Sequence, residues 1–380
     1  FAVPGGVVGF HTGVFAFAEK EDQMASVLAH ELAHLSQRHF ARGLEAQRAS
    51  SMVTLAGLLG SLVLAATAGG DAGMAAITAT QALAMDSRLR YSRSNEQEAD
   101  RIGLKTMERA NRDPGAVAEM FETLLRATRY SGSRPPEFLL THPVTERRIA
   151  DARGRAMANS MRQYAENPEF YLMQSRALLA LRTDNNLAIR EFQAQLDNNI
   201  HRPEAVKYGL ALAHTRAGNY KQARALLADL ISSDPSQLSF HHADIELSIA
   251  QQQYPQALAK VNKLLRISPN NYPLIRLKSE ALWQAHRYEQ ASDVLTDLSR
   301  IRPEDPLVWY QLAEVRGLAG NISGVHQARA EYFILVGAFD RARKQLGLAI
   351  KLVAADFKRS AIIRQRLVDI AEMEERIERL

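Results

Sequence analysis

A 34-residue period in the second half of the chain restricts its possible folds more than any other feature. Three kinds of residue recur at that spacing: Pro235, Pro269 and Pro303; Tyr220, Tyr254 and Tyr288; Ala223, Ala257 and Ala291. Each unit is predicted to run helix, turn, helix and proline, with the tyrosine in the turn. A period of this length with one helical pair per unit is typical of a solenoid, in which each unit packs only on its neighbours.

These residue types suit paired helices. A small alanine lets two helices approach closely, and a proline ends the second helix because it has no backbone N–H to donate. The pattern is that of tetratricopeptide repeats. The predicted units are 204–237, 238–271 and 272–305, with a fourth from 306 and a degenerate unit over 170–203. The turn signature recurs after only 17 residues at 337–342, so one helix is expected to serve two neighbouring hairpins.

The first half contains the motif His30-Glu31-Leu32-Ala33-His34, inside a stretch predicted to be helical over about 22–42. Helical side chains four residues apart lie about 5–6 Å from each other at Cβ, so His30 and His34 can turn both imidazoles toward one ion. Glu31 is displaced by one residue and is placed to accept a proton from the attacking water. The alternative is a helix with two ordinary histidines and no metal.

A catalytic metal of this kind needs a third protein ligand, and it must be His, Asp or Glu because the chain has no cysteine. The metzincin arrangement is excluded, since its third histidine would fall at Phe40. In the stretch Asn-Glu-Gln-Glu-Ala-Asp, Glu96 and Asp100 share a helix face and Glu98 points away. We predict Glu96 as the ligand and Asp100 as an acceptor that orients a ligand histidine. A solvated acidic first turn of a helix is the alternative.

His142 lies in a proline-containing loop from which it could approach the same metal. It would then either donate a hydrogen bond to the developing oxyanion or close the fourth ligand position and keep the enzyme idle. These roles exclude each other at any instant, and a locally hydrogen-bonded loop histidine is the third possibility. His39, five residues after His34, is predicted to be structural, and so is His11.

Two further segments carry predictions. Residues 7–17 are β-rich and predict a hairpin. Residues 49–70 contain no charged side chain, and an uncharged stretch of this length could span a membrane. Its many small residues favour close helix packing instead. We expect an apolar hairpin in a soluble protein, touching a membrane surface or covering the active site, rather than a span. Because the chain starts at Phe1, the natural precursor is expected to extend upstream and to carry a secretory signal there.

The stretches HELAH, SRSNEQEAD and THPVTERRI together resemble the gluzincin family that contains HtpX and the CAAX prenyl-protein proteases. The resemblance implies a zinc ion held by His30, His34 and Glu96, with Glu31 as the catalytic glutamate. Asp100 matches the aspartate four residues after the ligand glutamate. His142 and Arg148 match the histidine and arginine of the third motif. In this family the apolar segment after the zinc helix is embedded in the membrane in some members and soluble in others.

The order of protease motifs and repeats is similar to that of periplasmic family members. The resemblance therefore implies a zinc endopeptidase of the bacterial periplasm, acting in quality control and assembly of outer-membrane β-barrel proteins. Its implied substrates are unfolded or misassembled outer-membrane proteins. Its repeat domain would recruit these substrates or the β-barrel assembly machinery.

The predicted fold is mainly α: a gluzincin metalloprotease domain with a small β-hairpin over residues 1–160, and a tetratricopeptide-repeat solenoid over 166–380. Two other functions compete with the protease. A chaperone or scaffold would bind proteins through the repeats while the protease stays mostly latent, and an integral membrane protease would depend on residues 49–70. With 47 Lys and Arg against 42 Asp and Glu and no dense basic run, we expect no nucleic-acid partner.

Overall fold

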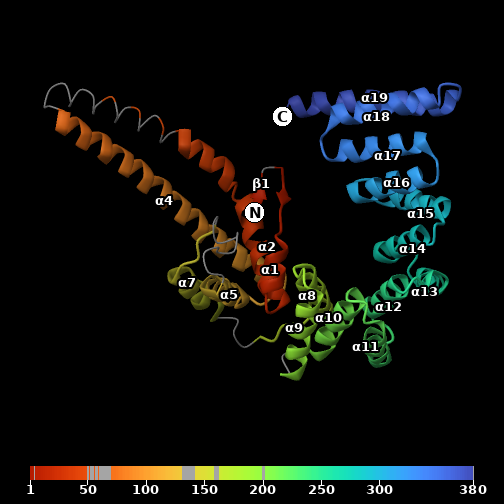
Figure 1. The fold of residues 1–380 in the computed structure, drawn as a ribbon. Coiled ribbons are helices and arrows are strands. Elements are labelled where there is room, and N and C mark those ends of the chain that lie inside the picture. The colour runs from red at the N-terminus through yellow and green to blue at the C-terminus, as the bar shows by residue number, and fades with distance from the viewer. Residues whose placement is uncertain are drawn as a thin grey trace. The chain divides into compact units, whose positions relative to one another are not determined.

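The computed structural model of the chain (Figure 1) describes residues 1–3, 5–48, 70–130, 142–157, 162–198 and 202–379, and the single residues 51, 55 and 59. The chain divides into two compact units, Phe1–Leu181 and Arg182–Leu380. The first contains the protease motifs and the second the repeats. The domain boundary between residues 160 and 166 stays a prediction.

The first unit begins with two short antiparallel strands, β1 (Ala2–Val3) and β2 (Val7–Val8), in which Ala2 pairs with Val8 and Val3 with Val7. The turn between them uses Gly5 and Gly6 at φ of 93° and 81°, backbone angles that glycine adopts without steric cost.

The hairpin predicted over residues 7–17 is wrong in its second half, because residues Thr12–Phe17 form helix α1. The Nδ1 atom of His11 accepts a hydrogen bond from the backbone N–H of Gly13 at 3.0 Å and so caps this helix. Thr12 and Gly13 therefore lie in the first turn of the helix.

Helix α2 (Glu21–Ser36) carries the His-Glu-x-x-His motif. Glu21 and Asp22 lie in its first turn, where negative charges interact favourably with the helix dipole and stabilise the helix. The single helix predicted over 22–42 is wrong at Arg38, whose φ of 54° interrupts it. Helical structure resumes over residues 39–48.

The other helices of this unit are α4 (Gly70–Arg109), α5 (Ala116–Tyr130), α7 (Glu146–Ala156) and α8 (Pro168–Ala180). α2 packs against α4 and α5, α7 against α4 and α5, and α8 against α1. The apolar segment 49–70 lies almost wholly outside the described residues. No helix in the described part of the chain is both long and apolar enough to cross a membrane.

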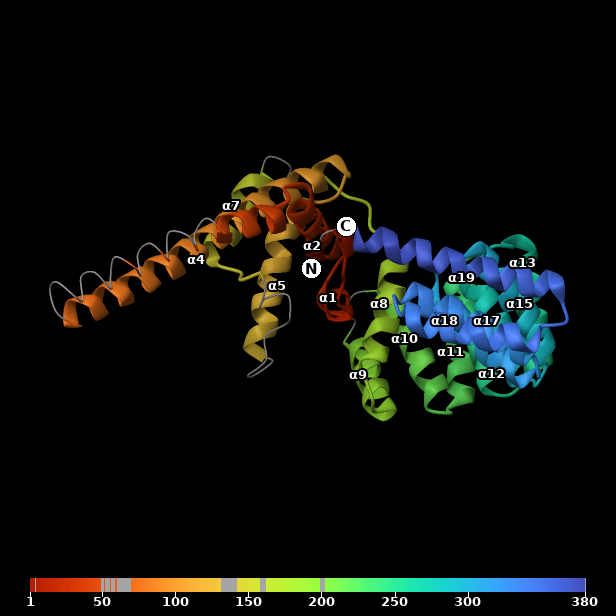
Figure 2. The ribbon, with the colours of Figure 1, turned by 90° about the horizontal axis from the view of Figure 1, so that it is seen from above.

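The second unit is a succession of helical hairpins (Figures 1 and 2). Its helices are α9 (Asn185–Asp197), α10 (Pro203–Arg216), α11 (Tyr220–Ser233), α12 (Leu238–Ala250), α13 (Tyr254–Ile267), α14 (Tyr272–Gln284), α15 (Tyr288–Ile301), α16 (Pro306–Leu318), α17 (Ile322–Leu335), α18 (Phe339–Leu352) and α19 (Phe357–Glu378). Each packs against its neighbour in the chain, and α17 packs against both α16 and α18. The predicted fold class is confirmed, including the helix shared by two hairpins.

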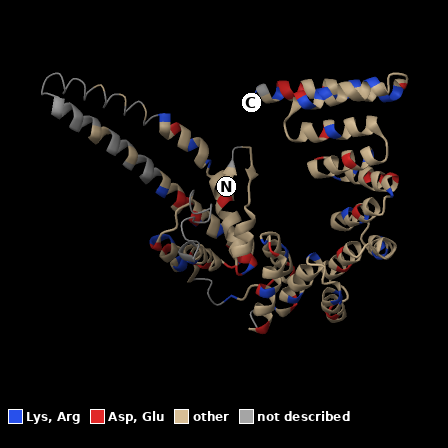
Figure 3. Cartoon of the chain, in the orientation of Figure 1, with Lys and Arg blue, Asp and Glu red and all other residues tan. Residues whose placement is uncertain are grey.

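The periodic alanines and prolines have the roles that the sequence predicts, but the tyrosines begin the second helix of each pair instead of lying in the turn. The three periodic alanines are fully buried between helices, and the three periodic tyrosines are the first residues of α11, α13 and α15. The prolines stand two residues after the last residues of the same helices. Figure 3 shows Lys and Arg interspersed with Asp and Glu along the described repeat helices, rather than gathered into a face of one sign.

Candidate metal centre

The site is built where α4 crosses α2, and Gly103 permits the close approach. A Cβ atom at position 103 would lie 3.2 Å from the backbone nitrogen of His30 and 3.3 Å from its Cα. These distances are tighter than ordinary van der Waals contact, so any side chain at 103 would push α4 away from α2. Because α2 carries His30 and α4 carries Glu96, the separation of the two helices sets the separation of these side chains.

Replacing Gly103 by valine is therefore expected to destabilise the protein by about 1–3 kcal/mol through overpacking and to weaken its binding of divalent metal. Chemical denaturation and metal titration would measure the two effects. The matched control is Gly154→Val on α7, where a Cβ would meet no atom within 4 Å. Equal metal affinity in wild type and Gly103→Val would contradict this account of the helix crossing.

The side chains of the three predicted ligands converge between the two helices. The Nε2 atoms of His30 and His34 lie 3.0 Å apart, Glu96 Oε2 lies 3.4 Å from His30 Nε2, and Glu96 Oε1 lies 3.3 Å from His34 Nε2. A tetrahedral site with bonds of about 2.0–2.1 Å has edges of about 3.3–3.4 Å. The donor atoms thus have the types and the spacing that fit a small tetrahedral cation.

His142 joins the same cluster. Its Nδ1 atom lies 3.0 Å from Glu96 Oε1 and 3.3 Å from His30 Nε2, and its Nε2 atom lies 3.3 Å from Glu31 Oε1. One ligand atom from each of His30, His34, Glu96 and His142 lies within 4.8 Å of the others. Glu31 itself is 1% exposed and stands beside the cluster, not inside it.

Asp100 and Arg148 form a second layer around these groups. Asp100 Oδ1 contacts His30 Nδ1 at 3.0 Å, while Arg148 donates to both carboxylate oxygens of Asp100 at 2.7 Å. Arg148 also lies 3.1 Å from Glu96 Oε2, donates to the carbonyl of Pro143 at 2.7 Å and stacks over the ring of Phe121. This arginine therefore ties α4, α7 and the chain beside His142 together.

His39 contacts His34 at its Nδ1 atom, opposite the Nε2 atom that faces the cluster. The sequence did not indicate this contact. His39 Nδ1 lies 2.9 Å from His34 Nδ1, and His39 Nε2 lies 3.1 Å from Glu98 Oε2, a carboxylate that Arg42 also contacts at 3.0 Å. Glu98 points away from the cluster, as its helix position predicts. Nothing in the sequence pattern reveals that the break at Arg38 turns His39 back onto His34.

These contacts fix which nitrogens are available to a metal. A carboxylate only accepts, so Glu98 accepts a hydrogen bond from His39 Nε2–H, and in that tautomer His39 Nδ1 accepts one from His34 Nδ1–H. Asp100 Oδ1 lies 3.0 Å from His30 Nδ1, so a proton on that nitrogen faces a carboxylate. The lone pairs of His30 and His34 are thereby assigned to Nε2, the atoms that face each other in the cluster.

The electrostatics of the site favour positive charge beside Glu96. Burial alone would lower the pKa of His30, but hydrogen bonds to Asp100 and Glu96 outweigh it and raise that pKa to about 9. Burial would raise the pKa of Glu96, yet hydrogen bonds from His142, His30 and His34 hold it far below its usual range. Without a metal, a proton on His30 faces Glu96, and a cation entering there must displace it.

The fold and the cluster define a class: a helical metallopeptidase with a His-Glu-x-x-His helix and a glutamate from a second helix, joined to tetratricopeptide repeats. Comparison with known proteins agrees. Residues 1–156 match the family profile of peptidase family M48, and residues 248–315 match a tetratricopeptide-repeat profile.

The chain is similar to the β-barrel assembly-enhancing protease of Escherichia coli K12, with 34% identity over 380 residues that span 99% of this chain and 77% of the relative. It is 33% identical to the protein of the same name in Yersinia pestis, over 90% of this chain and 70% of the relative. It is also 35% identical over 154 residues to the mitochondrial metalloendopeptidase OMA1 of Saccharomyces cerevisiae, covering 39% and 41% of the two chains. The chain belongs to peptidase family M48 and is a metalloprotease.

Proposed function

We propose that the chain is a zinc-dependent endopeptidase in which His30, His34 and Glu96 hold the zinc ion. The observation that supports this most is the spacing of their donor atoms: the two Nε2 atoms lie 3.0 Å apart, and each has one oxygen of Glu96 at 3.3 to 3.4 Å. When bound, zinc supplies a Lewis acid that polarises the peptide carbonyl and makes water more acidic.

The other groups move or hold protons. Glu31 accepts the proton of the attacking water and returns it to the leaving amine. Asp100 and Arg148 position His30 and Glu96 through their paired hydrogen bonds. The position of Glu31 supports its role as base, because it lines a cavity and its Oε1 atom lies 3.3 Å from Nε2 of His142, beside the ligand cluster.

His142 has two proposed roles, as an oxyanion donor or as a group that closes the fourth ligand position. In the present arrangement its Nδ1 atom lies among the ligand atoms, which supports the closing role for this conformation. A rotation that withdraws Nδ1 from Glu96 would be required before His142 could face a substrate oxygen.

We place this activity in the bacterial periplasm, in the quality control and assembly of outer-membrane β-barrel proteins. The support is the similarity to relatives named for enhancing β-barrel assembly, over 99% of this chain. The repeat unit binds proteins, because its stacked hairpins present extended surfaces of the kind that such solenoids use for recognition. We propose unfolded outer-membrane proteins and the β-barrel assembly machinery as its partners, with peripheral membrane contact through residues 49–70.

Removal of the metal tests the proposal directly. Dialysis against a chelator should abolish hydrolysis of an unfolded outer-membrane protein, and one equivalent of zinc per chain should restore it, because no residue of the described site supplies an alternative nucleophile. Cleavage would be followed by gel and the metal by elemental analysis. Full activity in metal-free protein would contradict the assignment.

A further inference from the structure

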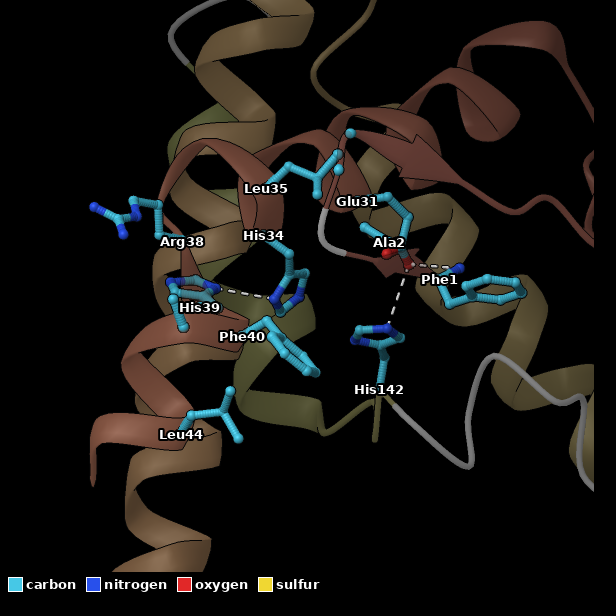
Figure 4. A pocket seen from close by; sticks show the side chains of 13 residues that line it. Phe1, Ala2, Glu31, His34, Leu35, Arg38, His39, Phe40, Leu44 and His142 are labelled. Carbon is cyan, nitrogen blue, oxygen red and sulfur yellow. Dashed lines mark hydrogen bonds and ion pairs between the residues drawn. The ribbon is translucent and has the colours of Figure 1, made fainter. Parts of the chain in front are cut away.

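A cavity of about 780 Å³ opens beside the metal cluster. Glu31, His34 and His142 form part of its lining, and Figure 4 shows their side chains with the neighbouring apolar ones. A peptide bond brought to Glu31 would place its flanking side chains in or near this space. The chemistry of the remaining lining therefore bears on which peptides can be cut.

The wall next to His34 is mostly apolar; Arg38 also lines the cavity there, and in Figure 4 its guanidinium extends away from Phe40 and His142. The wall includes Leu35, Phe40 and Leu44, and Phe40 and Leu44 are 59% and 47% exposed. Figure 4 shows the ring of Phe40 beside the imidazoles of His34 and His142, and Leu44 one helical turn further on. Large apolar side chains exposed inside a cleft are solvated unfavourably until another apolar group covers them.

The wall is held in place by polar contacts behind it. The positive φ of Arg38 ends α2 and redirects the chain, and the next residue, His39, is 5% exposed and bound to both His34 and Glu98. Arg42 adds a second contact to Glu98. Because Phe40 and Leu44 are four residues apart in the helical stretch 39–48, these anchors direct both toward the same side.

We infer that Phe40 and Leu44 form a specificity subsite that accepts a bulky apolar side chain adjacent to the scissile bond. This inference rests on the proposed endopeptidase function and names its substrate class more closely. Leucine, phenylalanine and methionine are buried in folded proteins and become accessible in unfolded chains. The subsite therefore favours unfolded proteins as substrates for two reasons. Their peptide bonds are accessible, and they expose the apolar side chains that the subsite binds.

Selectivity follows from desolvation. An apolar substrate side chain that covers Phe40 and Leu44 removes apolar surface from water on both partners, whereas a charged side chain would lose hydration against the same wall. Differences in the size of an apolar group at such a pocket change kcat/KM by about 10-fold to 200-fold. Truncating the wall should erase this difference without affecting Glu31 or the ligands.

The test uses the zinc-loaded full chain and internally quenched peptides that share one frame and differ at a single residue: Phe, Leu, Ala, Ser or Glu. Mass spectrometry locates the cleaved bond, and kcat/KM is measured for each peptide. The variants are Phe40→Ala, Leu44→Ala and the conservative Phe40→Leu. The matched control is Phe17→Ala on α1, where the phenylalanine is 44% exposed and does not line the cavity.

The wild type should cleave Phe and Leu peptides about 10-fold or more faster than Ala and Glu peptides. Phe40→Ala and Leu44→Ala should lower the rate on the Phe and Leu peptides more than the rate on the Ala peptide, and so reduce this ratio, while keeping the zinc content. Phe40→Leu should retain most of the ratio and Phe17→Ala all of it. Equal cleavage of all peptides by the wild type, or an equal loss on all peptides in Phe40→Ala, overturns the subsite alone. Failure of the zinc-loaded wild type to cleave any peptide overturns the proposed function, and the subsite with it.

Discussion

Replacement of Glu31 by glutamine is expected to lower the rate of peptide hydrolysis by about 10²-fold to 10⁴-fold, the usual contribution of a general base. Glutamine has nearly the same shape but a neutral amide, which cannot take the proton from the attacking water. The fold should survive, because Glu31 is 1% exposed and an uncharged amide costs less to bury than a carboxylate. Rates would be measured on an unfolded outer-membrane protein, with circular dichroism as the check on folding.

Zinc binding separates this effect from damage to the site. Glu31 is not among the converging ligand atoms, so Glu31→Gln should hold zinc as tightly as the wild type. Glu45→Gln serves as the matched control, since Glu45 is exposed in the same unit. Unchanged hydrolysis in Glu31→Gln would refute the metallopeptidase mechanism. If the variant loses hydrolysis yet keeps most of the biological effect in cells, the chain acts mainly as a chaperone or scaffold through its repeats.

The parts of the site that the sequence predicts are those fixed by local helical geometry. His30 and His34 lie one above the other because they are four residues apart on α2, and Glu96 and Asp100 share a face of α4 for the same reason. The repeats are equally predictable, because a 34-residue period needs no knowledge of distant contacts. Such features follow from the period of a single element.

The parts that the sequence does not predict depend on single backbone angles or on packing between distant segments. The positive φ of Arg38 is one such angle; it places His39 on His34 and turns Phe40 into the cavity. His142 reaches the cluster from 46 residues beyond Glu96; its proline-containing loop left this position as one possibility among three, and the resemblance to a family favoured it. The error at residues 12–17 has a similar origin, because a capping histidine makes a helix start where the β-rich composition suggested a strand.

Arg148 is the residue whose loss is expected to cost the most stability. Arg148→Met would leave the buried carboxylate of Asp100 without the two hydrogen bonds that now hold it. Removing one partner of a buried ion pair typically costs about 3–5 kcal/mol. The free energy of unfolding would be obtained by chemical denaturation. Arg155→Met on the same helix is the control, since the Arg155–Asp151 pair is exposed and should contribute less than about 1 kcal/mol.

Arg148→Lys distinguishes charge from geometry. Lysine keeps the positive charge but lacks the planar fork that contacts both oxygens of Asp100. The free energy of unfolding of Arg148→Lys should therefore lie between those of the wild type and Arg148→Met. A fully stable lysine variant would show that charge alone suffices.

The zinc ion should modify the cost of losing Arg148, because both supply positive charge to the same buried carboxylates. Glu96 Oε2 lies 3.1 Å from Arg148 and 3.4 Å from His30 Nε2, so a dication held by His30 and Glu96 would partly replace the lost guanidinium. Arg148→Met should therefore destabilise the chelated protein more than the zinc-loaded protein, each compared with its own wild type. An equal loss in the two states would mean that Arg148 stabilises the fold independently of the metal, through Asp100 and Pro143 alone.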